Sequence, residues 1–474
     1  MNRHVAFAII GAGSAGLSAL RQIKQTTDNF VLINSGPLGT TCARVGCMPS
    51  KVLIHVANTF YQRNSFERLG LTGAANVQCD IPAVLRHVRT LRDRFTNGMV
   101  DATKKLADAN QLIEGHAVLE GPQRIRVGEQ VIHAKHIIIA TGSSPIVPEP
   151  WRAFGGRMLT SENIFEQEDL PPRMAVIGLG AIGLELGQAI ARLGVTVSGF
   201  DQADTIGGVQ DPAVCDVAIA LQRQEWDLYL GAEAHVRDTE EGLEITSGDA
   251  RVVVDKILVA IGARPSVQGL GLETLGIELD QRGLPAIDPH TARIGDLPVY
   301  LVGDANGFRP ILHEALDEGF IAGRHSVQED RVCRCRRTPL RMVFSDPQCV
   351  AVGETMSELG DREIVVGEAS FESQSRAVVE GCNNGLLRIY ADVASGLLLG
   401  AEMAVPDGEH LGHLLALAIQ SELTVFDVLR MPFYHPAIEE GLRTALRAVA
   451  EKIKIEEVDG ELSLCESCPE APLQ

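Results

Sequence analysis

Two cysteines near the N-terminus are spaced for thiol–disulfide chemistry. Cys42 and Cys47 are five residues apart with Gly46 between them, and this spacing allows a disulfide to close around a turn. Lys51 follows Cys47 by four residues, one helical turn, and both a nearby cation and a helix N-terminus lower the pKa of a thiol. A bare pair with this spacing is more often two unrelated buried cysteines, so the surrounding sequence has to decide.

The pair comes right after a glycine-rich motif that occurs twice in the chain. Each copy has the pattern Gly-x-Gly-x-x-Gly between a strand-like apolar run and a helical pattern. The first glycine makes a turn, the second lets a pyrophosphate approach the backbone, and the third allows close helix–strand packing. One copy is weak evidence, but two copies in this context predict two dinucleotide sites. The motifs are Gly11, Gly13 and Gly16, then Gly178, Gly180, Ile182 and Gly183.

A polar residue follows the first glycine of each copy by 23 positions, at the end of the second strand. In the second copy it is Asp201, whose carboxylate can accept hydrogen bonds from a ribose 2′-hydroxyl and would repel a 2′-phosphate. Gln202 follows it rather than an arginine, so we expect NAD rather than NADP at this site. In the first copy the residue is Asn34, which is uncharged and should hold an adenosine ribose less strongly.

Composition excludes several classes of protein. The 474 residues carry a net charge of −20, which would repel a duplex nucleic acid. No apolar run reaches the roughly 18 residues that a membrane span needs, and the glycine spacing explains the apolar start better than a secretory signal does. The 10 cysteines are too sparse for a disulfide scaffold. We therefore expect a cytoplasmic protein without nucleic-acid or membrane partners.

The strand and helix patterns predict an α/β fold with two Rossmann-like dinucleotide-binding domains and a C-terminal α+β domain. Strand-like runs at 136–140, 256–260 and 299–302 each end in a turn with glycine, and prolines at 145–150 and 171–172 mark boundaries. The predicted first domain covers 1–150 and 271–335, the second 151–270, and the third 336–455. A tail, 456–474, carries Cys465 and Cys468.

At these motifs the chain resembles the pyridine nucleotide–disulfide oxidoreductases. Segment 42–51 is similar to their redox-active disulfide, and its ending Pro49-Ser50-Lys51 is similar to the dihydrolipoyl dehydrogenases and mercuric reductases of the family. The resemblance extends through Gly303-Asp304 and the turn Ser345-Asp-Pro347 to His435-Pro436-Ala-Ile-Glu-Glu440. It implies FAD in the first dinucleotide domain, NAD in the second, and a homodimer formed through the third.

The resemblance also implies roles for individual residues. Cys42 and Cys47 would form the redox disulfide, while His435, paired with Glu440, would act as the acid/base across the dimer interface. Lys51 and Glu185 would pair near the flavin. The implied FAD contacts are Gly11, Gly13, Gly16, Asn34, Thr41, Lys51, Ala117, Thr141, Gly142, Asp304 and Leu312. The implied NAD contacts are Gly178, Gly180, Ile182, Gly183, Glu185, Asp201 and Gly262.

The resemblance implies oxidation of dihydrolipoamide by NAD, with a lipoyl-bearing carrier protein or a small dithiol as the partner. His435 favours this activity, because mercuric reductases usually have a tyrosine there. Cys465 and Cys468 favour an alternative, an enzyme that passes electrons through C-terminal thiols as mercuric and large thioredoxin reductases do. A third possibility is a non-catalytic flavoprotein that senses the NADH/NAD ratio, which the retention of Cys42, Cys47 and His435 disfavours.

Several residues depart from the family pattern. Asn34 replaces the usual acidic residue, Thr41 stands where glycine is usual, and Arg44 stands where asparagine is usual. A cation at position 44 would lower the cysteine pKa values, favour an acidic substrate, or remain a solvated charge. No metal site is expected, since the Cys333-x-Cys335 spacing is poor for zinc. From the residues alone, Pro436 should lie in the first turn of a helix, just after His435.

Overall fold

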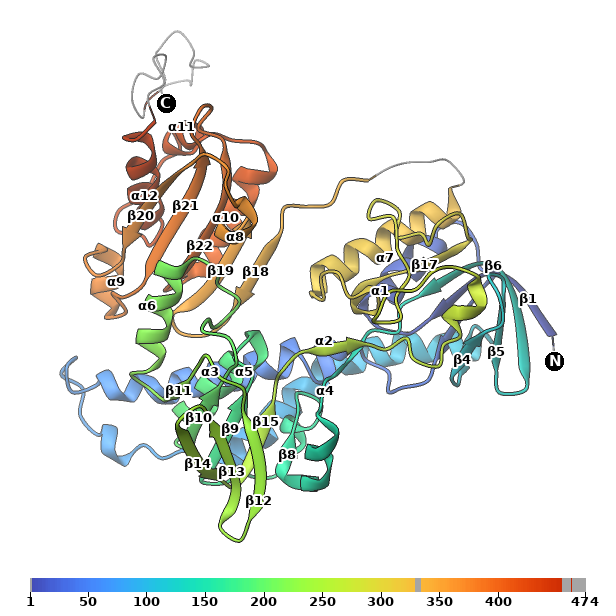
Figure 1. The fold of residues 1–474 in the computed structure, drawn as a ribbon, viewed down its shortest axis with the longest axis horizontal. Helices are drawn as coiled ribbons and strands as arrows, with labels where there is room; N and C mark the ends of the chain where they lie inside the picture. The colour runs from blue at the N-terminus through green and yellow to red at the C-terminus, as the bar shows by residue number, and fades with distance from the viewer. Residues whose placement is uncertain (1, 329–333, 454–461, 463–474) are drawn as a thin grey trace.

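The structure is a computed structural model that describes residues 2–328, 334–453 and 462. It contains three units, each built around a sheet (Figure 1). Cys333, Cys465 and Cys468 lie outside the described residues, so the expectations that involve them stay predictions. Within the described ranges, no helix is both long and apolar enough to cross a membrane.

The first unit has a seven-stranded sheet in the order β3-β2-β1-β6-β5-β4, with β17 paired to β6. Alternate residues of β1 bury into two different cores, Ile9 on the side of α1 and Ile10 on the other, because side chains of a strand alternate between faces. Helices α1 and α7 pack together over one face (Figure 1). The elements are β1 (Asn2–Ile10), α1 (Ser14–Ile23), β2 (Phe30–Asn34), β3 (Leu112–Glu114), β4 (Ala117–Leu119), β5 (Arg124–Val127), β6 (Gln130–Ile139), β17 (Val299–Leu301) and α7 (Leu312–Val327).

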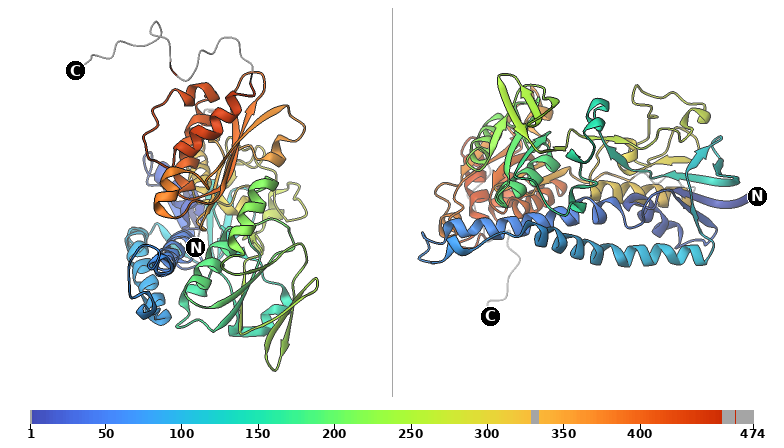
Figure 2. Two further views of the ribbon diagram at one scale, coloured as in Figure 1. Left: turned by 90° about the vertical axis from the view of Figure 1, so that its left-hand side faces the viewer. Right: turned by 90° about the horizontal axis from the view of Figure 1, so that it is seen from below.

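Three helices follow β2 and lead away from this sheet. They are α2 (Thr41–Arg44), α3 (Cys47–Tyr61) and α4 (Ile81–Asp108). The two long helices pack against each other and run along one side of the molecule, in blue in the right-hand view of Figure 2. Helix α3 also packs against α5 (Ala181–Arg192), which belongs to the second unit. The α3–α5 contact therefore joins the two predicted nucleotide-binding units.

The second unit repeats the first on a smaller scale, with a parallel sheet in the order β11-β10-β9-β15-β8. A two-stranded sheet of β7 and β16 links it to the first unit. Val267 and Leu270 already pack in a core of the first unit, so the chain returns there slightly before the expected boundary at residue 270. The elements are β7 (Ser143–Pro145), β8 (Met158–Leu159), β9 (Arg173–Ile177), β10 (Thr196–Phe200), α6 (Pro212–Gln222), β11 (Asp227–Tyr229), β12 (His235–Thr239), β13 (Gly242–Ser247), β14 (Ala250–Val254), β15 (Lys256–Val259) and β16 (Ala263–Pro265).

The third unit is an antiparallel sheet in the order β18-β19-β22-β21-β20, drawn in orange and red in Figure 1. Helices α10, α11 and α12 bury one face, while Tyr390 and Glu402, on the opposite face, hydrogen-bond toward α6 of the second unit. The expected α+β architecture is confirmed. The elements are β18 (Leu340–Val343), β19 (Gln348–Gly353), α8 (Met356–Leu359), β20 (Ile364–Ser370), α9 (Ser375–Glu380), β21 (Leu386–Asp392), β22 (Leu398–Val405), α10 (Gly408–Gln420), α11 (Val425–Leu429) and α12 (Glu440–Ala450).

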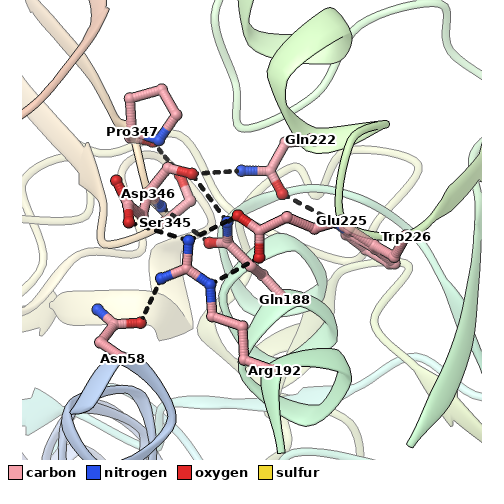
Figure 3. A network of polar contacts seen from close by, with 9 residues as sticks. All are labelled: Asn58, Gln188, Arg192, Gln222, Glu225, Trp226, Ser345, Asp346 and Pro347. Carbon is pink, nitrogen blue, oxygen red and sulfur yellow. Dashed lines mark hydrogen bonds and ion pairs between the residues drawn. The ribbon is translucent and has the colours of Figure 1, made fainter. Parts of the chain in front are cut away.

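A buried polar network around Arg192 of α5 holds the units together (Figure 3). Its guanidinium donates to both carboxylate oxygens of Glu225 at 2.6 and 2.7 Å and to Asn58 of α3 at 2.7 Å. It also pairs with Asp346, in the turn after β18, at 2.9 Å. The Arg192 side chain is only 3% exposed, so these acceptors replace the water that its charge loses on burial.

Replacing Arg192 with methionine should lower the free energy of unfolding by about 3 kcal/mol, because the Glu225 carboxylate stays buried without its cation. Urea unfolding of the two proteins measures the difference. Arg152→Met is the matched control, because Arg152 and its partner Glu149 are both largely exposed and their pair should be worth less than about 1 kcal/mol. Equal losses in the two variants would show that the network does not stabilise the fold.

Candidate active site

The two cysteines lie where the chain leaves the first sheet. Cys42 is in the single turn of α2, and Cys47 is the first residue of α3. Both are thiols in this structure, and Cys42 donates a hydrogen bond to the sulfur of Cys47. This bond, assisted by the positive charge of Lys51, lowers the pKa of Cys47 to about 7 although partial burial opposes the shift. The same bond, together with burial, raises the pKa of Cys42.

This asymmetry assigns different chemistry to the two sulfurs. Cys47 is the thiolate of the reduced pair near neutral pH, and it is therefore the better leaving group when the disulfide is attacked. Cys42 keeps its proton as a donor to that thiolate. A pair with one thiolate and one thiol is suited to forming and breaking its disulfide reversibly.

Lys51 forms the expected ion pair with Glu185 of α5, with Nζ at 2.7 and 2.9 Å from the two carboxylate oxygens. Glu185 is almost fully buried, whereas the Lys51 side chain is about one-third exposed. Phe344, one residue beyond β18, adds two contacts. Its N–H donates to Glu185 at 2.9 Å, and Lys51 Nζ lies 4.5 Å from the centre of its ring. All three units therefore contribute to the surroundings of Cys47.

The first glycine motif has the geometry of a pyrophosphate cradle. Gly11 has a φ of +108°, and a Cβ there would lie 2.2 Å from the Ala140 carbonyl oxygen. A Cβ on Gly16 would lie 2.0 Å from the oxygen of Gly11, so α1 can approach the strand only with glycine at this position. At Gly13, by contrast, a Cβ would meet nothing within 4 Å. The backbone at the start of α1 thus faces open space that a phosphate can enter.

The second glycine motif reproduces this geometry. Gly178 has a φ of +95°, and Gly183 would bring a Cβ to 1.8 Å from the Gly178 oxygen, while Gly180 faces open space. The polar residues at the two strand ends also correspond. The Asn34 side-chain oxygen accepts from Ala12 N at 3.1 Å, and an Asp201 oxygen accepts from Leu179 N at 2.6 Å. The internal repeat predicted from the sequence is therefore a repeat in three dimensions.

The surfaces around both motifs fit dinucleotide cofactors. Thr141 Oγ1, at the end of β6, is buried and has no hydrogen-bond partner within the described ranges, as expected of an atom that meets a ligand. Asp304 accepts from Ser143 at 2.9 Å, beside that loop. Ile182 and Leu312 expose 48% and 39% of their surfaces, apolar area that a bound ring would cover.

The remaining predicted cofactor residues lie in the corresponding loops. Gly142 and Gly262 follow β6 and β15 with φ values of +72° and +112°. Thr41 begins α2, and Ala117 begins β4. These residues stay the predicted contacts of FAD in the first unit and of NAD in the second.

His435 and Glu440 form a pair on the third unit. The imidazole Nδ1 lies 3.1 Å from each carboxylate oxygen, and this hydrogen bond lowers the pKa of Glu440 although desolvation acts in the opposite direction. The His435 side chain is 70% exposed. Within the described part of one chain, no interaction joins it to Cys42 or Cys47. The imidazole is therefore oriented by an ionised carboxylate, with Nε2 on the opposite edge of the ring.

The helix expected to begin at Pro436 begins four residues later, at Glu440. The prediction was wrong because the chain first forms a turn, in which the N–H of Glu440 donates to the Ala437 carbonyl at 3.3 Å, and side chains also bind the backbone of Ala437. The Ala437 carbonyl accepts from Gln374 at 2.6 Å, and its N–H donates to Glu440 at 3.2 Å. His435 consequently lies in a loop before the helix, and Glu440 in its first turn reaches back to the imidazole.

Comparison with known proteins assigns the family. The family described as pyridine nucleotide-disulphide oxidoreductase matches residues 5–319, and its dimerisation domain matches residues 340–446. The chain belongs to the pyridine nucleotide-disulphide oxidoreductases. This confirms the predicted family and fold, including the cofactor classes FAD and NAD that the family uses. The dimerisation domain supports the predicted homodimer.

Named relatives resemble the chain over nearly its whole length. Dihydrolipoyl dehydrogenase of Haloferax volcanii is 30% identical over 457 residues, which cover 92% of this chain and 94% of the relative. That of Trypanosoma brucei brucei is 30% identical over 473 residues, 94% and 96% of the two chains. Among solved structures, the HOCl-induced flavoprotein disulfide reductase RclA of Escherichia coli, as its Cu(II) complex, superposes with a TM-score of 0.81 at 24% identity, covering 95% and 100%. LpdA of Mycobacterium tuberculosis gives 0.80 at 25% identity, covering 94% and 99%.

Arg44 and Phe344 are the two residues at this site for which the sequence analysis was incomplete. The pKa values of Cys42 and Cys47 are set mainly by the hydrogen bond between them, by burial and by Lys51, and the roles expected of Arg44 stay predictions. Its buried Nε has no hydrogen-bond partner within the described ranges. Phe344 was missed, although it directly precedes the turn Ser345-Asp-Pro347 that carried part of the family resemblance.

Removing the charge of Lys51 should raise the pKa of Cys47. We expect Lys51→Met to move the pH midpoint for iodoacetamide alkylation of Cys47 in the pre-reduced enzyme upward by about one unit from its value near 7, since a neighbouring cation favours the thiolate. Peptide mass spectrometry quantifies alkylation at this residue. Lys105→Met, which removes an exposed lysine on α4, is the control and should leave the midpoint unchanged. An unmoved midpoint in the Lys51 variant would exclude Lys51 as the stabilising cation.

Proposed function

We propose that the chain is a dihydrolipoyl dehydrogenase, which oxidises dihydrolipoamide and reduces NAD. The main support is the arrangement of a low-pKa Cys47 beside Cys42 on one unit with the exposed His435–Glu440 pair on the dimerisation domain. A dithiol substrate needs both a disulfide to attack and a base to remove its proton. The names of the relatives at about 30% identity support the same activity.

In the proposed reaction, His435 Nε2 of one subunit takes a proton from a substrate thiol, and Glu440 stabilises the imidazolium that forms. The substrate thiolate attacks Cys42 Sγ, the Cys42–Cys47 bond breaks, and Cys47 leaves as the thiolate that Lys51 stabilises. The second substrate thiol then loses its proton and its sulfur attacks the first, which breaks the bond to Cys42 and forms the substrate's ring disulfide. Cys42 leaves as a thiolate and takes up that proton, while the proton held by His435 passes to solvent. The residues of the first glycine motif would hold FAD, which when bound would supply an acceptor for the electron pair of the reduced cysteines, and those of the second motif would hold NAD, the final acceptor.

The dimer gives His435 its role. The imidazole is exposed in the single chain, and the base and the cysteines lie on different units. In the proposed homodimer, His435 of each subunit faces the cysteine pair of the other, so each of the two active sites contains residues of both chains. The physiological partner is a lipoyl-bearing carrier protein or a small dithiol, and we place the activity in the cytoplasm.

His435→Gln should lower the turnover of dihydrolipoamide by about 100-fold or more, the usual contribution of a general base. Glutamine keeps a hydrogen-bonding group near Glu440 but cannot take the proton. Steady-state NADH formation at saturating substrate measures the effect. His413→Gln, on an exposed histidine of α10, is the control and should retain full activity. Wild-type turnover in the His435 variant would remove this residue from the mechanism.

The alternative through the tail thiols predicts a different dependence on chain length. We expect a chain that ends at Glu461, and so lacks Cys465 and Cys468, to oxidise dihydrolipoamide with NAD as fast as the full chain. The same pair of proteins should be assayed with Hg(II) and with other disulfides as electron acceptors. Activity confined to the full chain, without lipoamide turnover, would instead favour an enzyme that passes electrons through its tail.

A further inference from the structure

Phe344 contacts both members of the ion pair behind the redox cysteine. Its ring lies under the Lys51 ammonium, with Nζ 4.5 Å from the ring centre, and its N–H donates to Glu185 Oε1 at 2.9 Å. The same Glu185 oxygen accepts from Lys51 at 2.9 Å, and the other oxygen accepts at 2.7 Å. One residue of the dimerisation domain therefore binds the cation through its side chain and the anion through its backbone.

The chain on both sides of Phe344 is held firmly. Val343 is the last residue of β18 and pairs with Cys349 of β19. Ser345 is buried, and its hydroxyl donates to the Pro347 carbonyl at 2.8 Å. Asp346 exchanges two hydrogen bonds with Gln188 of α5, each at 2.8 Å (Figure 3). The Phe344 ring is thus fixed relative to α5, the helix that carries Glu185.

Lys51 needs such a constraint. Its side chain is flexible and about one-third exposed, so water competes for the ammonium. The face of an aromatic ring attracts a cation by about 0.5–2 kcal/mol, depending on its exposure to water. The Glu185 carboxylate and the Phe344 ring both contact Nζ. The ammonium is then held where its charge acts on the Cys47 sulfur.

We propose that Phe344 is a positioning residue of the redox centre, which holds the Lys51 ammonium beside Cys47 by presenting its ring to the cation and its N–H to Glu185. The dimerisation domain thereby acts on the cysteines of its own chain, in addition to supplying His435 to those of the partner. The inference rests on the proposed function only in taking Cys42 and Cys47 as the redox pair.

The test compares Phe344→Leu, which removes the ring but keeps the backbone N–H, with Phe344→Tyr, which keeps both. Each is made in the full-length, FAD-loaded protein and pre-reduced before alkylation with iodoacetamide across a pH series. We expect the midpoint at Cys47 to rise by about half a pH unit in the leucine variant and to stay at the wild-type value in the tyrosine variant. Phe344→Met, whose unbranched and flexible side chain adapts to an irregular gap, replaces the leucine variant if the latter does not fold.

A double variant separates positioning from a general loss of packing. If Phe344 acts through Lys51, Phe344→Leu should not move the midpoint further in a Lys51→Met background. A wild-type midpoint in Phe344→Leu and Phe344→Met, or an equal shift with and without Lys51, would overturn the proposal. Failure of the unaltered protein to oxidise dihydrolipoamide would instead contradict the proposed function, and the midpoints would still be measurable.

Discussion

The buried carboxylate of Glu185 is the constraint on which the active site depends. A charge in this position needs a compensating cation, and Lys51 of α3 is the cation that the structure provides. Because the pair crosses from the first unit to the second, satisfying Glu185 also fixes α3 against α5. Cys47 begins α3, so the same requirement that stabilises the interface places an ammonium one helical turn from the reactive sulfur. Stability and reactivity are thus linked through one ion pair.

The polar network around Arg192 lies farther along α5 than the Lys51–Glu185 ion pair and joins the same units. Glu185, Gln188 and Arg192 occupy successive turns of one buried helix, and each binds the segment 344–346 of the third unit. Along this helix, the side chains of successive turns therefore each have a charged or hydrogen-bonding partner in one short segment of the third unit. A shift of the third unit would therefore break contacts at both ends of the row, which makes the geometry at Cys47 depend on the packing of the whole chain.

Local patterns were sufficient to predict the nucleotide-binding parts of the fold. A turn that only glycine can make is visible in the sequence, and Gly11 and Gly178 have the positive φ values that the motif requires. The start of α12 was missed because a turn precedes it, and the carbonyl of Ala437 in that turn also accepts from Gln374, 63 residues away. Phe344 was missed for a similar reason, since its role depends on partners from two other units. Sequence spacing records short-range geometry, whereas these two features arise from contacts between distant segments.

The division of the site between chains follows from this arrangement. A base permanently bound to the cysteines of its own chain would protonate the Cys47 thiolate or block the approach of a dithiol. His435 lies on an exposed loop, where Glu440 orients its imidazole, and the cysteine pair of the same chain has Lys51 as its neighbouring cation. In the proposed homodimer, the substrate enters between a base from one subunit and a disulfide from the other. Under this proposal dimerisation completes the active site, while the contacts of Phe344 and Asp346 with α5 hold the third unit against the second within each chain.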